Sequence, residues 1–232
     1  MAQTEEKTSI KEFVGRQIKK WERMYSQAQA QAEPRLPSIT VSMEPGGGGT
    51  ILAQKIADRL DFDLFNREIV EAIAKSAEIR ESVIETLEKD RLSGIEDFIA
   101  SLVKDYYIHP DVYLEHLFKV ISTIAEHGRA VIVGRGANFI LPAHGIFAVR
   151  VIAPLEIRIR NVAQRYNVAA EEAKRRVIQR ESRRRAFIRH SFNADISDPI
   201  HYNLVVNTGK MSMAAALEAV IAAIMAPLAS NP

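Results

Sequence analysis

The stretch that decides the fold is Ser38-Ile-Thr-Val-Ser-Met-Glu-Pro-Gly-Gly-Gly-Gly-Thr50. Up to Met43, apolar residues alternate with polar ones, which predicts a strand. The four glycines that follow permit backbone conformations that other residues avoid. From Thr50 to residue 60, apolar residues recur at helical spacing. A strand, a glycine loop and the start of a helix together direct free backbone N–H groups at a phosphate, so the stretch predicts an anion site.

The spacing of this stretch can be compared with the phosphate loop G-x-x-x-x-G-K-[ST]. With Gly48 as the second glycine, Thr50 takes the hydroxyl position that binds Mg²⁺. Met43 then replaces the first glycine, and Gly49 replaces the lysine. A flexible turn without a ligand is therefore the alternative to a phosphate site. The entropy lost on ordering four glycines favours a ligand.

Composition limits the class of protein. The 232 residues suit one large domain or a core with an inserted subdomain, and 47% of them are hydrophobic. The formal charge of +2 predicts attraction to neither nucleic acid nor membrane. The chain has no cysteine, no apolar run of membrane-spanning length and no hydrophobic leader at its N-terminus. These features predict a cytoplasmic protein.

Residues 1–36 are predicted to form a separate N-terminal helical arm. Apolar residues recur at helical spacing from Ile10 to Trp21, and Pro34 and Pro37 end the helix. The arm packs either on the body of its own chain or on a second subunit, and the sequence leaves both open. A homo-oligomer through this arm is thus one expectation.

The rest of the chain, residues 37–228, alternates predicted strands with helices, which favours a doubly wound parallel α/β sheet. Residues from about 66 to 128 are mostly helical and charged, and they predict a helical insertion, interrupted at His109 and Pro110. Residues 130–133 form a wholly apolar strand that ends just before Arg135. Arg135 is therefore expected at the carboxyl edge of the sheet, where α/β proteins bind ligands.

A basic run between residues 174 and 190 allows three interpretations. It can be a solvated helix face, a nucleic-acid surface, or a lid whose arginines close on phosphates. Glutamates interrupt the run, which weakens the nucleic-acid interpretation. Arg185 and Arg189 are four residues apart and would share one helix face.

Five segments, in one order, resemble the cytidylate kinase-like family of P-loop kinases. They are the glycine loop, 65–69 (Phe-Asn-Arg-Glu-Ile), 131–138 (Val-Ile-Val-Gly-Arg-Gly-Ala-Asn), 185–189 (Arg-Ala-Phe-Ile-Arg) and 198–208 (with Asp-Pro, Tyr202 and Leu-Val-Val-Asn-Thr). The resemblance covers about residues 38–225. It implies a doubly wound parallel sheet of P-loop kinase type, with an inserted helical NMP-binding region and an arginine-rich lid at about 169–200.

The resemblance also implies the site. The donor phosphates of ATP would lie on Gly46, Gly47, Gly48, Gly49 and Thr50. Thr50 would in addition be the Mg²⁺ ligand. Arg135 would lie near the acceptor nucleotide, and Arg185 and Arg189 would be lid arginines and catalytic residues.

Three departures from the family pattern bear on activity. Gly49 replaces the loop lysine, Gly136 replaces an aspartate and Val133 an acidic residue, although phosphoryl transfer ordinarily uses a lysine and acidic metal supports. Glu44 is a candidate partial substitute near the metal. The sequence predicts ATP-dependent phosphoryl transfer to a nucleoside monophosphate, with CMP favoured. A nucleotide-binding or regulatory protein that no longer turns over is the main alternative, and a nucleic-acid-binding module the third.

Overall fold

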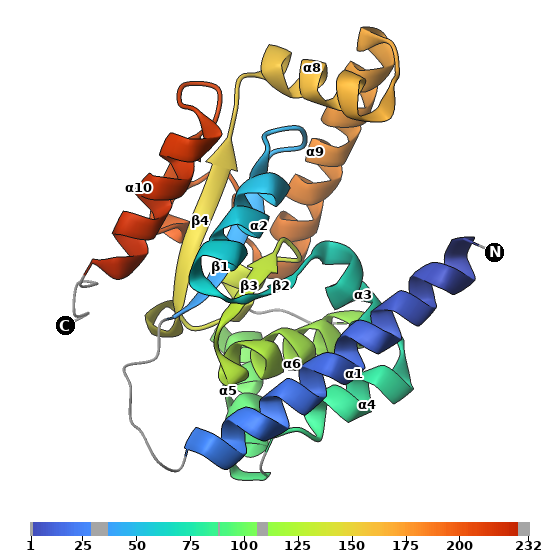
Figure 1. The fold of residues 1–232 in the computed structure, drawn as a ribbon, viewed down its shortest axis with the longest axis vertical. Helices are drawn as coiled ribbons and strands as arrows, with labels where there is room; N and C mark the ends of the chain where they lie inside the picture. The colour runs from blue at the N-terminus through green and yellow to red at the C-terminus, as the bar shows by residue number, and fades with distance from the viewer. Residues whose placement is uncertain (1, 29–36, 88, 106–110, 227–232) are drawn as a thin grey trace.

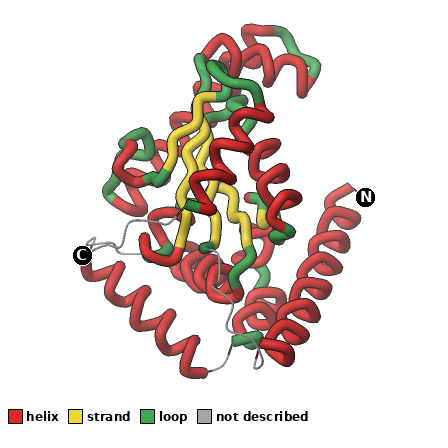
Figure 2. Tube along the Cα trace, turned by 60° about the vertical axis from the view of Figure 1, so that its left-hand side comes forward, coloured by secondary structure: helices red, strands yellow, loops and turns green. Residues whose placement is uncertain are grey.

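The computed structural model describes residues 2–28, 37–87, 89–105 and 111–226. Five strands form one sheet: β1 (Ser38–Met43), β2 (Asp63–Phe65), β3 (Ala130–Val133), β4 (Ile146–Ile152) and β5 (Leu204–Asn207). All pairings are parallel, and the order across the sheet is β2-β3-β1-β4-β5. Helices flank the strands on both sides (Figures 1 and 2). The predicted doubly wound parallel sheet is confirmed.

The remaining elements follow in chain order. They are α1 (Ala2–Ala28), α2 (Gly49–Leu60), α3 (Arg67–Lys75), α4 (Ala77–Ile84), α5 (Lys89–Asp105), α6 (Val112–His127), α7 (Ala137–Ile140), the 3₁₀ turn η1 (Ala143–Gly145), α8 (Leu155–Tyr166), α9 (Ala170–Phe192), the 3₁₀ turn η2 (Pro199–His201) and α10 (Met213–Met225). Within the described part of the chain, the closing helix α10 ends at Met225.

Strand β1 lies at the centre because both of its faces are covered. Val41 pairs with Val133 of β3 on one side and Val149 of β4 on the other, and all three side chains are buried. Strands buried on both faces are typical of parallel sheets. Since the strands are parallel, the segments that follow β1, β3, β4 and β5 meet at one edge of the sheet.

Two apolar cores hold the layers together. On one face, α2 and α10 bury Leu52 and Val220 against the side chains of β1 and β4. On the other face, Phe118 of α6 packs with Phe65 and Ile132 of the sheet. Each core forms because the helices present their apolar stripe to a strand surface that is also apolar.

Four helices, α3 to α6, lie between β2 and β3. Three of them begin with a side-chain cap, in which Asn66, Ser76 and Asp111 accept a hydrogen bond from the backbone of the first turn. Helices α4 and α5 lie toward the end of the molecule opposite α8 (Figure 1). The interruption predicted at His109 and Pro110 lies outside the described residues.

Helix α1 packs on the body of its own chain. Val14 and Trp21 are buried, and the Trp21 ring stacks on His127 with centroids 3.9 Å apart. Gln17 and Lys20 both donate to the carboxylate of Asp63, at the start of β2. The apolar stripe predicted from the sequence is thus covered by the chain itself in this structure.

Helices α8 and α9 form a pair at the carboxyl edge of the sheet (Figure 1). Helix α9 is anchored by Ile188 and Phe192, which are buried, and Phe192 stacks on Phe118 and Phe139. The basic residues of α9 consequently divide into those that face the sheet edge and those that face solvent.

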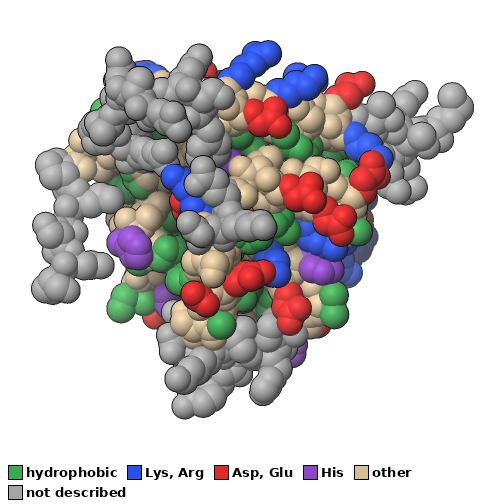
Figure 3. All heavy atoms as spheres, turned by 90° about the horizontal axis from the view of Figure 1, so that it is seen from below, with side chains coloured by type: hydrophobic (Ala, Val, Ile, Leu, Met, Phe, Trp, Pro, Cys, Tyr) green, Lys and Arg blue, Asp and Glu red, His purple; other side chains and the backbone are tan. Residues whose placement is uncertain are grey.

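The surface opposite this edge carries both signs of charge. Figure 3 shows acidic and basic side chains interspersed there with apolar and neutral ones. Within the ranges that the structure describes, no helix is long and apolar enough to span a bilayer.

Candidate active site

The glycine loop connects β1 to α2 at the carboxyl edge of the sheet. Gly46 and Gly48 have φ angles of 81° and 77°, in the left-handed region that favours glycine. A Cβ atom on Gly46 would lie 2.4 Å from the carbonyl oxygen of Arg158. Glycine therefore allows the loop to pack closely on α8.

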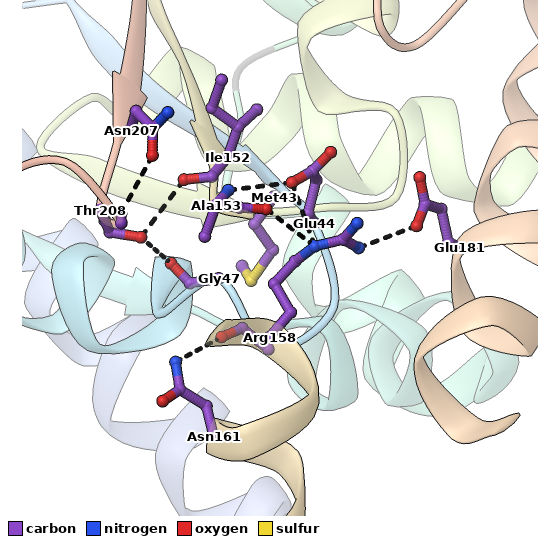
Figure 4. A network of polar contacts seen from close by, with 12 residues as sticks. Met43, Glu44, Gly47, Ile152, Ala153, Arg158, Asn161, Glu181, Asn207 and Thr208 are labelled. Atoms are coloured by element: carbon purple, nitrogen blue, oxygen red, sulfur yellow. Dashed lines mark hydrogen bonds and ion pairs between the residues drawn. The ribbon is translucent and has the colours of Figure 1, made fainter. Parts of the chain in front are cut away.

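Side chains of two other elements hold the carbonyl groups of this loop (Figure 4). Thr208 Oγ1 donates to the carbonyl oxygen of Gly47 at 2.7 Å, and Asn161 Nδ2 donates to that of Gly46 at 2.8 Å. Among the described residues, the backbone N–H groups of residues 48–50 find no acceptor. These N–H groups lie at the start of α2, where the helix dipole favours an anion.

Gly49, at the position of the motif lysine, lies against Met43. A Cβ atom on Gly49 would be 2.5 Å from Met43 Cβ and 3.0 Å from its Sδ. The Thr50 hydroxyl donates to the same sulfur at 3.5 Å. Met43 and Gly49, the two positions that depart from the phosphate-loop motif, therefore pack directly against each other.

Arg158, on α8, ties the loop to α9 (Figure 4). Its Nε donates to the carbonyl oxygen of Ala153 at 2.9 Å and lies 3.4 Å from Glu44 Oε2, while Nη1 donates to Glu181 Oε2 at 2.8 Å. The side chain is only 8% exposed. Burial acts to raise the pKa of the Glu181 carboxyl, but Arg158 and Arg185 outweigh it and hold that pKa below its usual value. Two carboxylates thus neutralise Arg158.

Arg184 reaches from α9 to the loop. Its Nη1 donates to the carbonyl oxygen of Met43 at 2.6 Å, and no carboxylate among the described residues pairs with it. Burial and then the charges of surrounding arginines lower the pKa of Arg184 to about 10; these are Arg67, Arg135, Arg150 and Arg180. Like charges brought together in a partly buried place are unfavourable, and a bound anion would offset that cost.

Arg150 is a buried charge within β4. It is 5% exposed, its Nη1 donates to Ser42 Oγ at 2.7 Å, and its guanidinium lies 5.9 Å from the ring centroid of Tyr202. Its Nε has no partner among the described residues. Burial lowers the pKa of Arg150 and raises that of the Tyr202 hydroxyl. A buried cation whose hydrogen-bond partner is neutral is unusual, and its position would favour an anionic ligand beside it.

Arg135, predicted near the acceptor, follows β3 in a strained conformation. Its φ of 56° is uncommon for a residue with a side chain, and such strain clusters at functional sites. Its Nη1 lies 2.7 Å from Glu71 Oε1, and its guanidinium stacks 5.4 Å above the Phe187 ring. Glu71 also binds Arg67 at 3.1 Å, so one carboxylate serves two arginines.

A small hollow, open to solvent, lies where these residues meet. Its lining comes from the end of β1 and the two residues after it, from β4, from α9 and from the segment after α9, and consists of Met43, Glu44, Pro45, Arg150, Glu181, Arg184, Arg185 and Ile196. Arginines from three elements lie in or beside it and outnumber the carboxylates. The hollow is therefore suited to an anionic ligand.

The two predicted lid arginines occupy different environments. Arg185 lines the hollow and donates to Glu181 Oε1 at 3.2 Å, with its side chain 53% exposed. Arg189 lies one turn further along α9, exposed, with no ion pair among the described residues. The structure thus places Arg185 in the lining of the hollow and Arg184 in contact with the Met43 carbonyl oxygen, whereas Arg135 lies in its pair with Glu71.

The predicted Mg²⁺ ligand, Thr50, is exposed at the start of α2. Glu44 offers a carboxylate nearby: its Oε2 accepts from the backbone N–H of Ala153 at 2.9 Å, whereas its Oε1 has no partner among the described residues. Those residues contain no group of three or more histidines, aspartates or glutamates that could hold a metal alone. Mg²⁺ bound with a nucleotide takes most ligands from phosphates and water, so Thr50 and Glu44 fit it in that form.

Sequence reasoning assigned no role in the site to Arg150, Arg158, Arg184 or Thr208. Arg150 did leave a signal, because it is the one charge in an otherwise apolar strand. Arg184 lies within the basic run. The rotation of α9 about its axis turns this side chain toward the loop, and that rotation depends on the packing of Phe192.

Comparisons with known proteins show the family and the fold of the chain. The sequence profile of the cytidylate kinase-like family matches residues 38–210. A cytidylate kinase of Pyrococcus horikoshii is 27% identical over 174 residues, covering 75% of this chain and 81% of its own length. One from Methanocaldococcus jannaschii is 24% identical over 189 residues, covering 80% and 96%. A solved structure of an uncharacterized protein from Eubacterium ventriosum shares the fold, with a TM-score of 0.62, 19% identity and coverage of 81% of this chain and 98% of that one.

Proposed function

Because this chain belongs to the cytidylate kinase-like family, we propose that it transfers the γ-phosphoryl group of ATP to a nucleoside monophosphate. Membership confirms the resemblance found in the sequence and supports a nucleotide kinase, a transferase on a P-loop kinase fold. The cytidylate kinases among its relatives favour CMP as the acceptor.

One observation carries the proposal: arginines without sufficient counter-charge line a hollow at residues 43–45, directly before the glycine loop and its free backbone N–H groups. Arg184 contacts the loop itself, and Arg150 lines the same hollow with an unpartnered Nε. Guanidinium groups match phosphate oxygens in geometry and charge. Two phosphorylated ligands, a donor and an acceptor, would supply the negative charge that this site lacks.

The roles of the residues follow from their positions. The backbone of Gly46, Gly47, Gly48, Gly49 and Thr50 would bind the donor phosphates. Arg135, together with Arg67, would bind the acceptor phosphate, since both lie on the side of the site formed by β3 and α3. Arg185 and Arg189 would act from α9, with Arg185 the nearer to the hollow.

The reaction needs little covalent chemistry from the protein. An oxygen of the acceptor phosphate attacks the γ-phosphorus, and the bond from that phosphorus to the β–γ bridging oxygen breaks. ADP leaves with the electron pair, and the acceptor becomes a nucleoside diphosphate. The attacking oxygen is already ionised at neutral pH, so no general base is required. Mg²⁺, when bound beside Thr50 and Glu44, would neutralise phosphate charge.

A second candidate function is nucleotide binding without turnover. Gly49, Gly136 and Val133 stand where related kinases carry a lysine and acidic residues, and Met43 excludes a side chain at position 49. A protein of this kind would bind ATP and a monophosphate and release them unchanged.

Calorimetric titration followed by a turnover assay separates the two functions. ATP, CMP, UMP, AMP and GMP are titrated singly with Mg²⁺, and each monophosphate is then incubated with ATP while ADP release is followed. The kinase predicts saturable binding and formation of one nucleoside diphosphate. Tight binding with no product establishes the second function, and binding of no nucleotide refutes both.

A further inference from the structure

The missing loop lysine and the methionine at the start of the loop belong together. A side chain at position 49 would clash with Met43, because the Cβ atoms would be 2.5 Å apart. A lysine there would also have to cross the space filled by Met43 Sδ and Cε. The positive charge that a phosphate loop ordinarily draws from its lysine must therefore come from another element.

Several arginines near the loop already have carboxylate partners. Arg158 is held by Glu44 and Glu181, which leaves it no free charge. Arg67 and Arg135 share Glu71 on the far side of the hollow.

Arg184 differs from these in both partner and position. It contacts the backbone of the loop, through the carbonyl oxygen of Met43 at 2.6 Å, and it has no carboxylate partner among the described residues. Arg150, which also has none, lies deeper, within β4 and against Ser42.

We infer that Arg184 takes the place of the loop lysine and binds the β- and γ-phosphates of the donor. The inference rests on the proposed function, since it assigns a donor-phosphate role at the same site. Release from the carbonyl group of Met43 would leave Nη1 and Nη2 free for two phosphate oxygens, a bidentate contact that lysine cannot make. Because the charge comes from α9 rather than from the loop, donor binding would depend on the position of α9.

The test restores the lysine and asks whether Arg184 becomes dispensable. Four proteins are compared: wild type, Arg184→Ala, the triple variant Met43→Gly/Gly49→Lys/Arg184→Ala, and Arg183→Ala as a matched control. Arg183 neighbours Arg184 on α9 but is exposed. Affinities for ADP, pyrophosphate, AMP and CMP are measured by calorimetry, and turnover is measured separately, with circular dichroism to verify folding.

The expected result is a fall of about tenfold or more in affinity for ADP and pyrophosphate in Arg184→Ala, with CMP and AMP within about twofold. The triple variant should recover most of the loss, and Arg183→Ala should match wild type.

Because binding is the readout, absence of turnover in wild type would refute the proposed kinase activity without touching this assignment. Unchanged ADP and pyrophosphate affinity in Arg184→Ala would overturn it, as would a loss confined to CMP. A folded triple variant without recovery would also overturn it. If the triple variant does not fold, the contrast between pyrophosphate and CMP in Arg184→Ala decides the question alone.

Discussion

Arg184 donates a hydrogen bond to the carbonyl oxygen of Met43 at 2.6 Å, which joins the long helix α9 to the first residue of the phosphate-loop motif. The contact brings the Arg184 cation into a site that already holds several other arginines. Burial, and then the charges of those arginines, lower the pKa of Arg184 to about 10. A carbonyl oxygen compensates for this only in part. The free protein is consequently strained electrostatically in a way that a phosphorylated ligand would relieve.

Replacing Arg184 should therefore stabilise the free protein and weaken its function. Arg184→Met keeps the apolar stem and removes the charge, and we expect the free energy of unfolding to rise by about 1 kcal/mol, as for other poorly compensated buried charges. Inorganic pyrophosphate should raise the free energy of unfolding of wild type more than that of the variant. Urea denaturation with and without pyrophosphate measures both effects. A less stable variant that pyrophosphate stabilises as much as wild type would contradict the electrostatic argument.

Glu181 should make stability depend on pH in the acid range. Its folded pKa lies below the usual 4.5, so its contribution is present above about that pH and is lost as the pH falls through the folded value. Glu181→Gln should cost about 1–3 kcal/mol at pH 7, because Arg158 loses a partner, and the difference from wild type should shrink toward pH 3. Thermal melts from pH 3 to pH 7 test this, with the exposed Glu171→Gln as control. A difference independent of pH would refute the assignment.

Trp21 should be essential to the docking of α1. Its side chain is 3% exposed and stacks on His127, so Trp21→Ala should lower the free energy of unfolding by about 3–5 kcal/mol. The exposed Arg23→Ala is the control. Because α1 packs on its own chain, the loss should not depend on protein concentration, and the mass from light scattering should not change. A concentration-dependent loss would instead favour an arm that bridges subunits.

Gly49→Ala should destabilise the loop by about 1–3 kcal/mol through overpacking against Met43. Adding Met43→Gly to the Gly49→Ala protein removes the clash and should recover most of that cost. The double variant should therefore be more stable than the sum of the two single effects predicts. Urea denaturation of the two single variants and the double variant gives the coupling energy. Additive effects would show that the two positions are independent.

Arg185 and Arg189 test the lid directly. If they act in transfer, Arg185→Ala or Arg189→Ala should lower the rate constant by about 10³ or more, and Arg185→Lys should also be impaired because it lacks the planar fork. For the exposed Arg189, the free energy of unfolding should change by no more than about 0.5 kcal/mol. Stopped-flow or coupled assays give the rates. Full activity in both alanine variants would remove these two residues from the site.

The sequence predicted the parts of the fold that depend on local pattern. The alternation up to Met43, the apolar strand before Gly134 and the helical period after Thr50 each specify an element by short-range spacing. The order of these elements then allowed few arrangements besides a parallel sheet. Arg135 was placed at the sheet edge for the same reason, because it directly follows a buried strand.

Side-chain direction across the site could not be predicted in this way. Whether Arg184 or Arg185 faces the loop depends on a rotation of about 100° about α9, and the packing of Phe192 and Ile188 fixes that rotation. Arg158 pairs with Glu44, more than a hundred residues earlier in the sequence, and with Glu181 on a different helix, so spacing gives no signal.

A crystal structure grown with saturating ATP analogue and Mg²⁺ tests the central claim most directly. The account predicts phosphate density within hydrogen-bond distance of the backbone nitrogen atoms of residues 48–50, with the Arg184 guanidinium turned from Met43 onto the β- or γ-phosphate. A glycine loop that stays closed without density, or a nucleotide bound elsewhere while Arg184 remains on the Met43 carbonyl oxygen, would contradict it.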